Sequence, residues 1–199
     1  MKIILTSAKE FKQKNIPVQY DTIIKLALSY YPELKNVHVK FKVKKKLSPL
    51  TAQPTFFSFF RKAKNRKYNI TISNKTIGKF SPILLSNLSF NAQVGVIGHE
   101  LSHISDYNNT YGIYFLKLVF MHLSKQKIDK FEYATDMLCI EHGLGFQLLS
   151  WSKEVRFKLN LILWKGINQT NFKGRERYMN SESIITEIKR NDVYKSNSN

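Results

Sequence analysis

From Val37 to Lys44, apolar residues alternate one for one with histidine and lysine. A period of two is typical of a β-strand with one buried face, and the opposite face here is basic. Tyr68–Ser73 is rich in β-branched and aromatic residues and predicts a second short strand. Between them, residues 47–67 mix prolines and phenylalanines with a run of lysine and arginine, which indicates a loop or hairpin with a basic tip.

A period of three to four residues governs most of the remaining chain. Asp21 can cap a helix whose apolar stripe ends before Pro32. The same spacing predicts further helices with approximate limits Phe90–Tyr107, Ile113–Leu123, Ile128–Trp151 and Val155–Trp164, and a last one starting near Asn180. Strands early and helices late indicate an α+β fold. We expect a single domain over residues 1–192 and a polar, frayed tail over 193–199.

The positive charge is concentrated in the first half of the chain. The 199 residues carry a formal net charge of +18, and residues 1–98 hold 18 lysines and arginines against Glu10, Asp21 and Glu33. Such a half suits an anionic partner such as nucleic acid, a membrane surface or an acidic substrate, or it is a solvated lysine-rich surface. The single cysteine, Cys139, excludes an internal disulfide framework and a cysteine-based zinc finger.

The sequence predicts neither a secretion signal nor a transmembrane span. The longest apolar stretch, Tyr111–Leu123, has 13 residues and is interrupted by Lys117. That is shorter than the roughly 18–20 residues that a bilayer requires. We expect a buried helix there, with a helix on a membrane surface as the alternative, and a cytoplasmic protein.

The chemically specific signal is His99-Glu100-Leu101-Ser102-His103, a His-Glu-x-x-His sequence inside a predicted helix. Histidines four residues apart lie on one helix face, about 40° apart around the axis. Both imidazoles can therefore reach one Zn²⁺, while Glu100 faces the open side of the metal and can take a proton from a zinc-bound water.

A catalytic zinc needs a third protein ligand and keeps one position for water. The first candidate is Glu132, with Asp136 one turn further on to accept the free ring N–H of a ligand histidine. Asp106 shares a face with His99 but lies a turn too far along a straight helix. His142 lies about 80° from the Glu132 face, and His122 falls in the apolar run.

Together, the His-Glu-x-x-His sequence and the downstream Glu132-x-x-x-Asp136 resemble the gluzincin class of zinc metallopeptidases, in particular its compact bacterial members. The resemblance implies a zincin-like fold with a small mixed sheet, an active-site helix and a glutamate helix. It implies one zinc ion held by His99, His103 and Glu132, with Glu100 as general base and Asp136 as support. It also implies that Tyr68–Ser73 is the edge strand on which an extended peptide docks.

The resulting functional hypothesis is a zinc-dependent endopeptidase. Candidate donors for the oxyanion or for substrate contacts are Tyr107, Tyr133 and His142. The alternative hypothesis is a basic protein associated with nucleic acid, in which the zinc site is structural or acts on DNA-bound proteins. It rests on the positive N-terminal half, since phosphate contacts need lysine and arginine.

Overall fold

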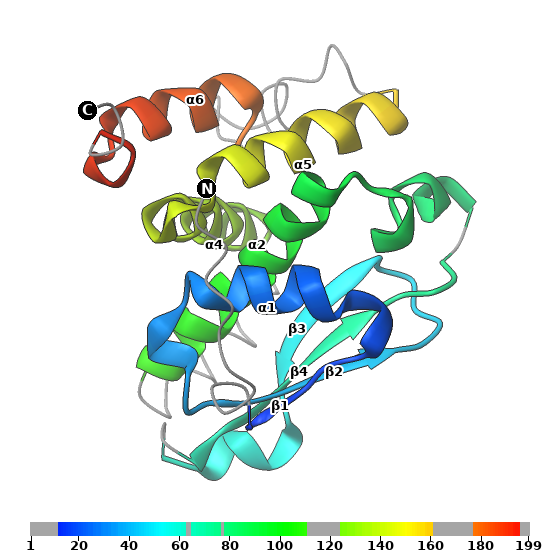
Figure 1. The fold of residues 1–199 in the computed structure, drawn as a ribbon, viewed down its shortest axis with the longest axis vertical. Coiled ribbons are helices and arrows are strands. Elements are labelled where there is room, and N and C mark those ends of the chain that lie inside the picture. Colours follow the sequence, from blue (N-terminus) through cyan, green and yellow to red (C-terminus); the bar gives the residue numbers. More distant parts are fainter. Residues whose placement is uncertain (1–11, 63–64, 77, 111–123, 161–176, 196–199) are drawn as a thin grey trace.

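The fold combines a small sheet with a larger set of helices, as the α+β expectation required (Figure 1). The computed structural model describes residues 12–62, 65–76, 78–110, 124–160 and 177–195. The strands are β1 (Lys14–Asn15), β2 (His38–Val43), β3 (Leu50–Pro54) and β4 (Lys67–Ile72). The main helices are α1 (Asp21–Ser29), α2 (Phe90–Asn109), α4 (Lys125–Cys139), α5 (Gly145–Lys158) and α6 (Ser181–Arg190). Shorter helices are η2 (Val18–Tyr20), η3 (Pro32–Leu34), η4 (Phe56–Phe60), η6 (Gly78–Ile83), η7 (Leu85–Asn87), η8 (Ile140–Leu144) and η9 (Asp192–Tyr194).

The sheet has the order β1-β2-β4-β3, with β3 antiparallel to β4 and the other pairs parallel. Phe41 of β2 and Ala52 of β3 both flank Ile70 of β4 in register. These positions lie on the apolar face, and the alternation in β2 places His38 and Lys40 on the exposed opposite face. The predicted strand with one basic face is therefore confirmed.

The edge strand is not the one expected from the sequence. Tyr68–Ser73 corresponds to β4, which lies inside the sheet between β2 and β3. The edge strands are the two-residue β1 and β3, and β3 lies in the segment 47–67 that we expected to be a loop or hairpin. Its sequence, Leu-Thr-Ala-Gln-Pro, has weak alternation, and it ends at Pro54, a residue that sheets tolerate at their edges.

Helix α2 is the centre of the packing. It contacts β3 on the sheet side, α1 beside it, and α4 and α5 on the other side (Figure 1). Gly95 makes the crossing with α5 possible, because a Cβ at this position would collide with the backbone carbonyl of Gln147.

Both ends of α2 are held by opposite charges from elsewhere in the chain. At its N-terminus, the carboxylate of Glu154 accepts hydrogen bonds from the backbone N–H and the hydroxyl of Ser89. At its C-terminus, the buried guanidinium of Arg66 donates to the carbonyl oxygens of Tyr107 and Thr110. Each charge has the sign that the helix dipole favours at that end.

The helix expected over Ile128–Trp151 is interrupted. A π-helical turn, η8, separates α4 from α5, and Gly143 within it has φ of 89°, a left-handed value that glycine adopts without strain. Helix α5 then continues to Lys158, through the start of the helix expected over Val155–Trp164. The helix expected over Ile113–Leu123 lies outside the described residues.

At the C-terminus, the packed chain extends further than expected. Val193 and Tyr194 belong to η9, and the Tyr194 hydroxyl donates to the carbonyl of Ile140. None of the helices in the described part of the chain has the length and apolarity needed to cross a bilayer.

Candidate metal centre

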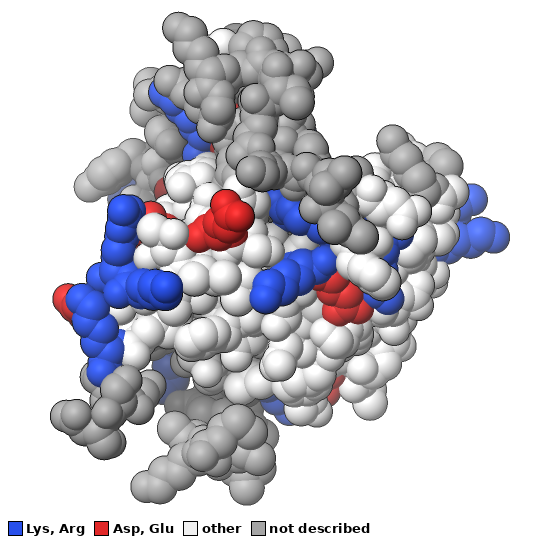
Figure 2. Space-filling view, turned by 90° about the horizontal axis from the view of Figure 1, so that it is seen from above, with Lys and Arg blue, Asp and Glu red and all other residues white. Residues whose placement is uncertain are grey.

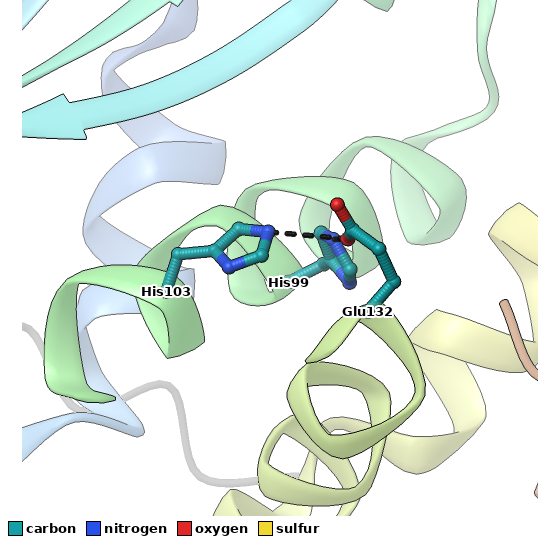
Figure 3. Close-up of side chains that lie close together, drawn as sticks. All are labelled: His99, His103 and Glu132. Atoms are coloured by element: carbon teal, nitrogen blue, oxygen red, sulfur yellow. Dashed lines mark ion pairs between the residues drawn. The ribbon is translucent and has the colours of Figure 1, made fainter. Parts of the chain in front are cut away.

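Helix α2 presents His99 and His103 one turn apart toward α4 (Figure 3). Both side chains are buried, at 3% and 7% exposure, and their rings meet edge to face with centroids 4.8 Å apart. The helical spacing therefore brings the two imidazoles together, as the motif predicted.

Glu132 of α4 completes a three-residue cluster (Figure 3). Its Oε2 atom lies 3.2 Å from Nε2 of His99 and 3.3 Å from Nε2 of His103. One ligand atom from each of the three residues lies within 4.8 Å of the others. The residue that the sequence made the first candidate for third ligand is thus the one that closes the cluster.

The outer nitrogen of each imidazole faces an oxygen. Nδ1 of His99 lies 2.8 Å from Oδ1 of Asp136, and Nδ1 of His103 lies 3.2 Å from the hydroxyl oxygen of Thr135. The Thr135 hydroxyl donates its one proton to the carbonyl of Phe131, 2.9 Å away. It can therefore only accept from His103, so both histidines carry their proton on Nδ1.

This arrangement directs the second nitrogen of each imidazole at the centre of the cluster. A neutral imidazole with N–H at Nδ1 has a lone pair at Nε2. Both Nε2 atoms face Oε2 of Glu132, a buried atom with no other hydrogen-bond partner among the described residues. Three electron-rich atoms without a shared proton repel one another unless a cation lies between them.

The spacing of these atoms also suits a metal ion. Ligands about 2.0–2.1 Å from a tetrahedral ion are roughly 3.3 Å from each other. The separations of 3.2 Å and 3.3 Å between Glu132 and the two imidazoles agree with that geometry. The residues present therefore fit a zinc ion.

The pKa shifts of His99 and Glu132 also show that the cluster favours a positive charge between its members. Burial lowers the pKa of His99, but its hydrogen bonds to Asp136 and Glu132 and their negative charge raise it more, to well above its ordinary value. Burial raises the pKa of Glu132, but the hydrogen bonds and charges of the two histidines lower it by more, so the net pKa is far below the usual range. Without a metal, the site draws in a proton instead.

Glu100 lies beside the cluster and is not part of it. Its side chain is 7% exposed, and burial raises its pKa, while the positive charge that the histidines can carry opposes the shift. The backbone N–H of Ala52 in β3 hydrogen-bonds to its carboxylate. A carboxylate kept off the metal ligands, with a raised pKa, has the properties of a general base.

A mainly apolar cleft of about 550 Å³ opens at this point. His99 and Glu100 lie in its wall, together with Leu50 at the start of β3 and Trp151 of α5. Tyr178, in the segment before α6, also lines it, with its ring centroid 5.7 Å from that of His99. The cluster therefore faces a space large enough for a substrate side chain.

Asp136 joins three parts of the site. Its Oδ1 accepts from His99, and its Oδ2 accepts from the backbone N–H of Met179, 2.7 Å away. It thereby fixes both the ligand imidazole on α2 and the segment that carries Tyr178. The role of imidazole support that the sequence suggested for Asp136 matches this geometry.

The other candidate residues are distributed differently. The Tyr107 ring stacks on His103, and Asp106 is near enough to His103 for their charges to interact, but neither belongs to the ligand cluster. Tyr133 packs against the hydrophobic core. His142 meets Glu33 and does not belong to the cluster of His99, His103 and Glu132. His122 lies outside the described residues.

Sequence reasoning missed Thr135 and Tyr178. Thr135 lies three residues after Glu132, on the same side of α4, but a threonine in a helix has no pattern that marks it as a partner of histidine. Tyr178 reaches the cleft through tertiary contacts of its neighbours, Met179 with Asp136 and Arg177 with Asp129. No family model, curated protein or solved structure matches this chain.

Proposed function

We propose that the protein is a zinc-dependent endopeptidase of the gluzincin type, with a zincin-like arrangement of sheet, active-site helix and glutamate helix. The observation that carries the proposal is the convergence of Nε2 of His99, Nε2 of His103 and Oε2 of Glu132. Two imidazoles and one carboxylate form a three-ligand set that leaves one position open, as in catalytic zinc sites. When bound, zinc polarises a carbonyl group and lowers the pKa of water.

Glu100 supplies the proton transfer. It is the carboxylate beside the cluster that makes no ligand contact, and it opens into the cleft with His99. In the proposed reaction it accepts a proton from the attacking water and passes it to the nitrogen of the departing amine. Burial raises its pKa and so brings its proton affinity closer to that needed near neutral pH.

The substrate backbone docks on β3, because this edge strand runs next to Glu100 and has no further strand on its outer side in the described part of the sheet. Thr55 N–H donates to the carbonyl of Lys67, and Ser73 N–H donates to that of Pro49. In an antiparallel pair, every second residue directs its N–H and C=O groups toward the partner strand. These two bonds show that Pro49 and Thr55 face β4, so the N–H and C=O groups of Leu50 and Ala52 point away from β4. A peptide added to this edge runs past the cluster, with apolar side chains directed into the cleft.

The test compares wild type with Glu100→Gln in a peptide-cleavage assay with metal content measured on the same samples. We expect Glu100→Gln to keep about one zinc per chain and to lose roughly 100- to 10,000-fold in kcat, as removal of a general base does. Glu182→Gln makes the same chemical change at an exposed position of α6 and serves as the control.

Two results would contradict the proposal. Cleavage that survives unchanged in Glu100→Gln would remove the carboxylate from the mechanism. Purified protein that binds iron in preference to zinc would point to the oxygen-dependent chemistry that two histidines and a carboxylate also support.

A further inference from the structure

Two adjacent phenylalanines protrude from η4, the short helix that follows the edge strand. Phe56 and Phe57 are 73% and 69% exposed, and η4 is the cyan turn at the bottom of Figure 1. Large apolar side chains scattered singly over a surface are ordinary, but two in succession on one projecting turn form a small apolar patch.

Positive side chains flank this pair. Arg61 and Lys62 directly follow η4 and are exposed. The exposed Lys67 lies close by, because β4 begins with it where β3 ends, and it pairs in register with exposed His38 on the open face of the sheet. We call Phe56, Phe57, Arg61, Lys62 and Lys67 the η4 patch.

The surrounding sequence contains no negative charge to neutralise this patch. Residues 34–99 include 13 lysines and arginines and not one aspartate or glutamate. The helical side of the molecule differs: seen from above, lysine and arginine are interspersed there with acidic side chains around a broad uncharged surface (Figure 2). The η4 patch is therefore a cationic and apolar feature of one end of the protein.

We propose that the η4 patch docks on the surface of an anionic phospholipid bilayer. Phe56 and Phe57 enter the boundary between headgroups and acyl chains, where aromatic rings are favoured, and the three cations contact lipid phosphates. Attachment of this kind is peripheral and needs no spanning helix. It combines an apolar insertion with a basic cluster, the two contributions that reversible membrane binding requires.

The arrangement of the rings favours lipid over single-stranded nucleic acid. Phe56 and Phe57 meet edge to face, with centroids 5.6 Å apart and planes at 81°, so the edge of one ring covers the face of the other. Base stacking needs open ring faces arranged along a groove. The outward positions of the neighbouring strands carry histidine, lysine, asparagine, threonine and glutamine and so add no stacking platform.

The edge strand connects the η4 patch to the cleft. Strand β3 begins at Leu50 in the cleft wall and ends at Pro54, two residues before Phe56. Docking of the η4 patch therefore places one end of this strand at the lipid surface. The docking itself does not depend on the proposed peptidase activity and is tested without it.

The experiment measures cosedimentation of the full chain with vesicles of phosphatidylcholine alone or with phosphatidylglycerol added. We expect binding to the anionic vesicles that falls steeply as salt is raised. Phe56→Ser with Phe57→Ser should weaken it by about tenfold or more. Arg61→Glu with Lys62→Glu should weaken it by at least about 25-fold, since each cation near an anionic surface contributes roughly a fivefold factor.

Matched controls separate the η4 patch from general effects of charge and apolarity. Phe157→Ser removes a phenylalanine of similar exposure, 68%, from α5, and Lys153→Glu with Lys189→Glu reverses two exposed charges on the helical side. Both should bind the vesicles like wild type. Thermal unfolding of every variant checks that the fold is kept.

Three outcomes would overturn the proposal. The first is equal binding to neutral and anionic vesicles, or to neither. The second is an equal loss of binding in the control variants. The third is binding of a single-stranded oligonucleotide that is tighter than vesicle binding and is lost in the variants of the η4 patch, which would assign the patch to nucleic acid.

Discussion

Two clusters of histidine and carboxylate lie against two faces of helix α2, and they differ in how their histidines are partnered. On one face, His99 and His103 meet Glu132. On another face, roughly 120° around the axis from His99, Ser105 donates to Glu33 of η3, and Glu33 in turn meets His142 of η8. The residue types are similar, so composition alone does not distinguish a metal site from an ion pair.

In the second cluster a single imidazole meets a single carboxylate. Nδ1 of His142 donates to the carbonyl of Leu138, 2.7 Å away, and Nε2 donates to Oε1 of Glu33, 3.0 Å away. With both nitrogens acting as donors, the ring is an imidazolium, and it stacks on the ring of Tyr31 with centroids 4.2 Å apart. His142 thus has a separate acceptor for each of its nitrogens, whereas His99 and His103 direct their second nitrogens at one shared atom, Oε2 of Glu132.

The most direct test of the difference between the two clusters is to remove one carboxylate from each of them and to measure metal binding. Glu132→Ala takes away a proposed ligand, and we expect metal affinity to fall by more than the roughly 10- to 100-fold that loss of an outer hydrogen-bond partner causes. Glu33→Ala removes a carboxylate from the other face and should leave metal content unchanged. Metal analysis after dialysis against a chelator of graded strength measures both.

Equal metal retention in the two variants would show that Glu132 is not a ligand. Equal loss would show that both variants disturb α2 rather than the site. Circular dichroism of the metal-free proteins distinguishes these cases, because disruption of α2 lowers the helical signal and the loss of one metal ligand does not.

Thr135 tests whether the position of the proton on His103 matters. In Thr135→Val, the Nδ1–H of this imidazole loses its acceptor at constant side-chain shape, and the ring then gains from carrying its proton on Nε2, where the metal would bind. We expect metal affinity to fall by about tenfold, measured by competition with a chromogenic chelator. Thr135→Ser keeps the hydroxyl and should bind like wild type, and an equal loss in both variants would contradict this role.

The sequence predicted those parts of the site whose residues are close together along one helix. His99, Glu100 and His103 lie within one turn and a half of one helix, so local geometry places them together before any tertiary structure is known. Glu132 and Asp136 share a helical turn as well, and the search for a third ligand selected them. Thr135 lies between them, but its role depends on a single rotamer and on the Phe131 carbonyl.

In the fold, too, elements with a regular pattern of apolar residues were predicted and elements without one were not. Strand β2 alternates strictly because one face is buried and the other open, and α2 repeats its apolar residues with helical period. Strand β3 has neither signal, since an edge strand is held by backbone hydrogen bonds to one neighbour and its side chains are partly solvated. The interruption of the helix at Gly143 could not be predicted from the sequence either. Glycine is tolerated within a helix, and the helix is interrupted there only where packing requires it.

The smallest expected effect concerns the pH dependence of the second cluster. Burial lowers the pKa of His142, but the hydrogen bond and charge of Glu33, with a smaller effect from Glu141, raise it above the ordinary value. Burial raises the pKa of Glu33, and its hydrogen bonds from His142 and Ser105 lower it more. The ion pair therefore contributes fully between the ordinary, unfolded-state pKa values of Glu33 and His142. Its contribution is lost as pH rises through the pKa of His142.

His142→Gln should accordingly destabilise the protein more near about pH 6 than near about pH 9. The difference in unfolding free energy is expected to be at most about 1 kcal/mol at the lower pH, because both side chains are partly exposed and solvent screens the pair. Thermal unfolding of wild type and variant at both pH values measures it, with exposed His38→Gln as the control. A destabilisation that is the same at the two pH values would mean that His142 acts through stacking on Tyr31 alone, and the contrast between the ion-paired His142 and the clustered His99 and His103 would lose its second half.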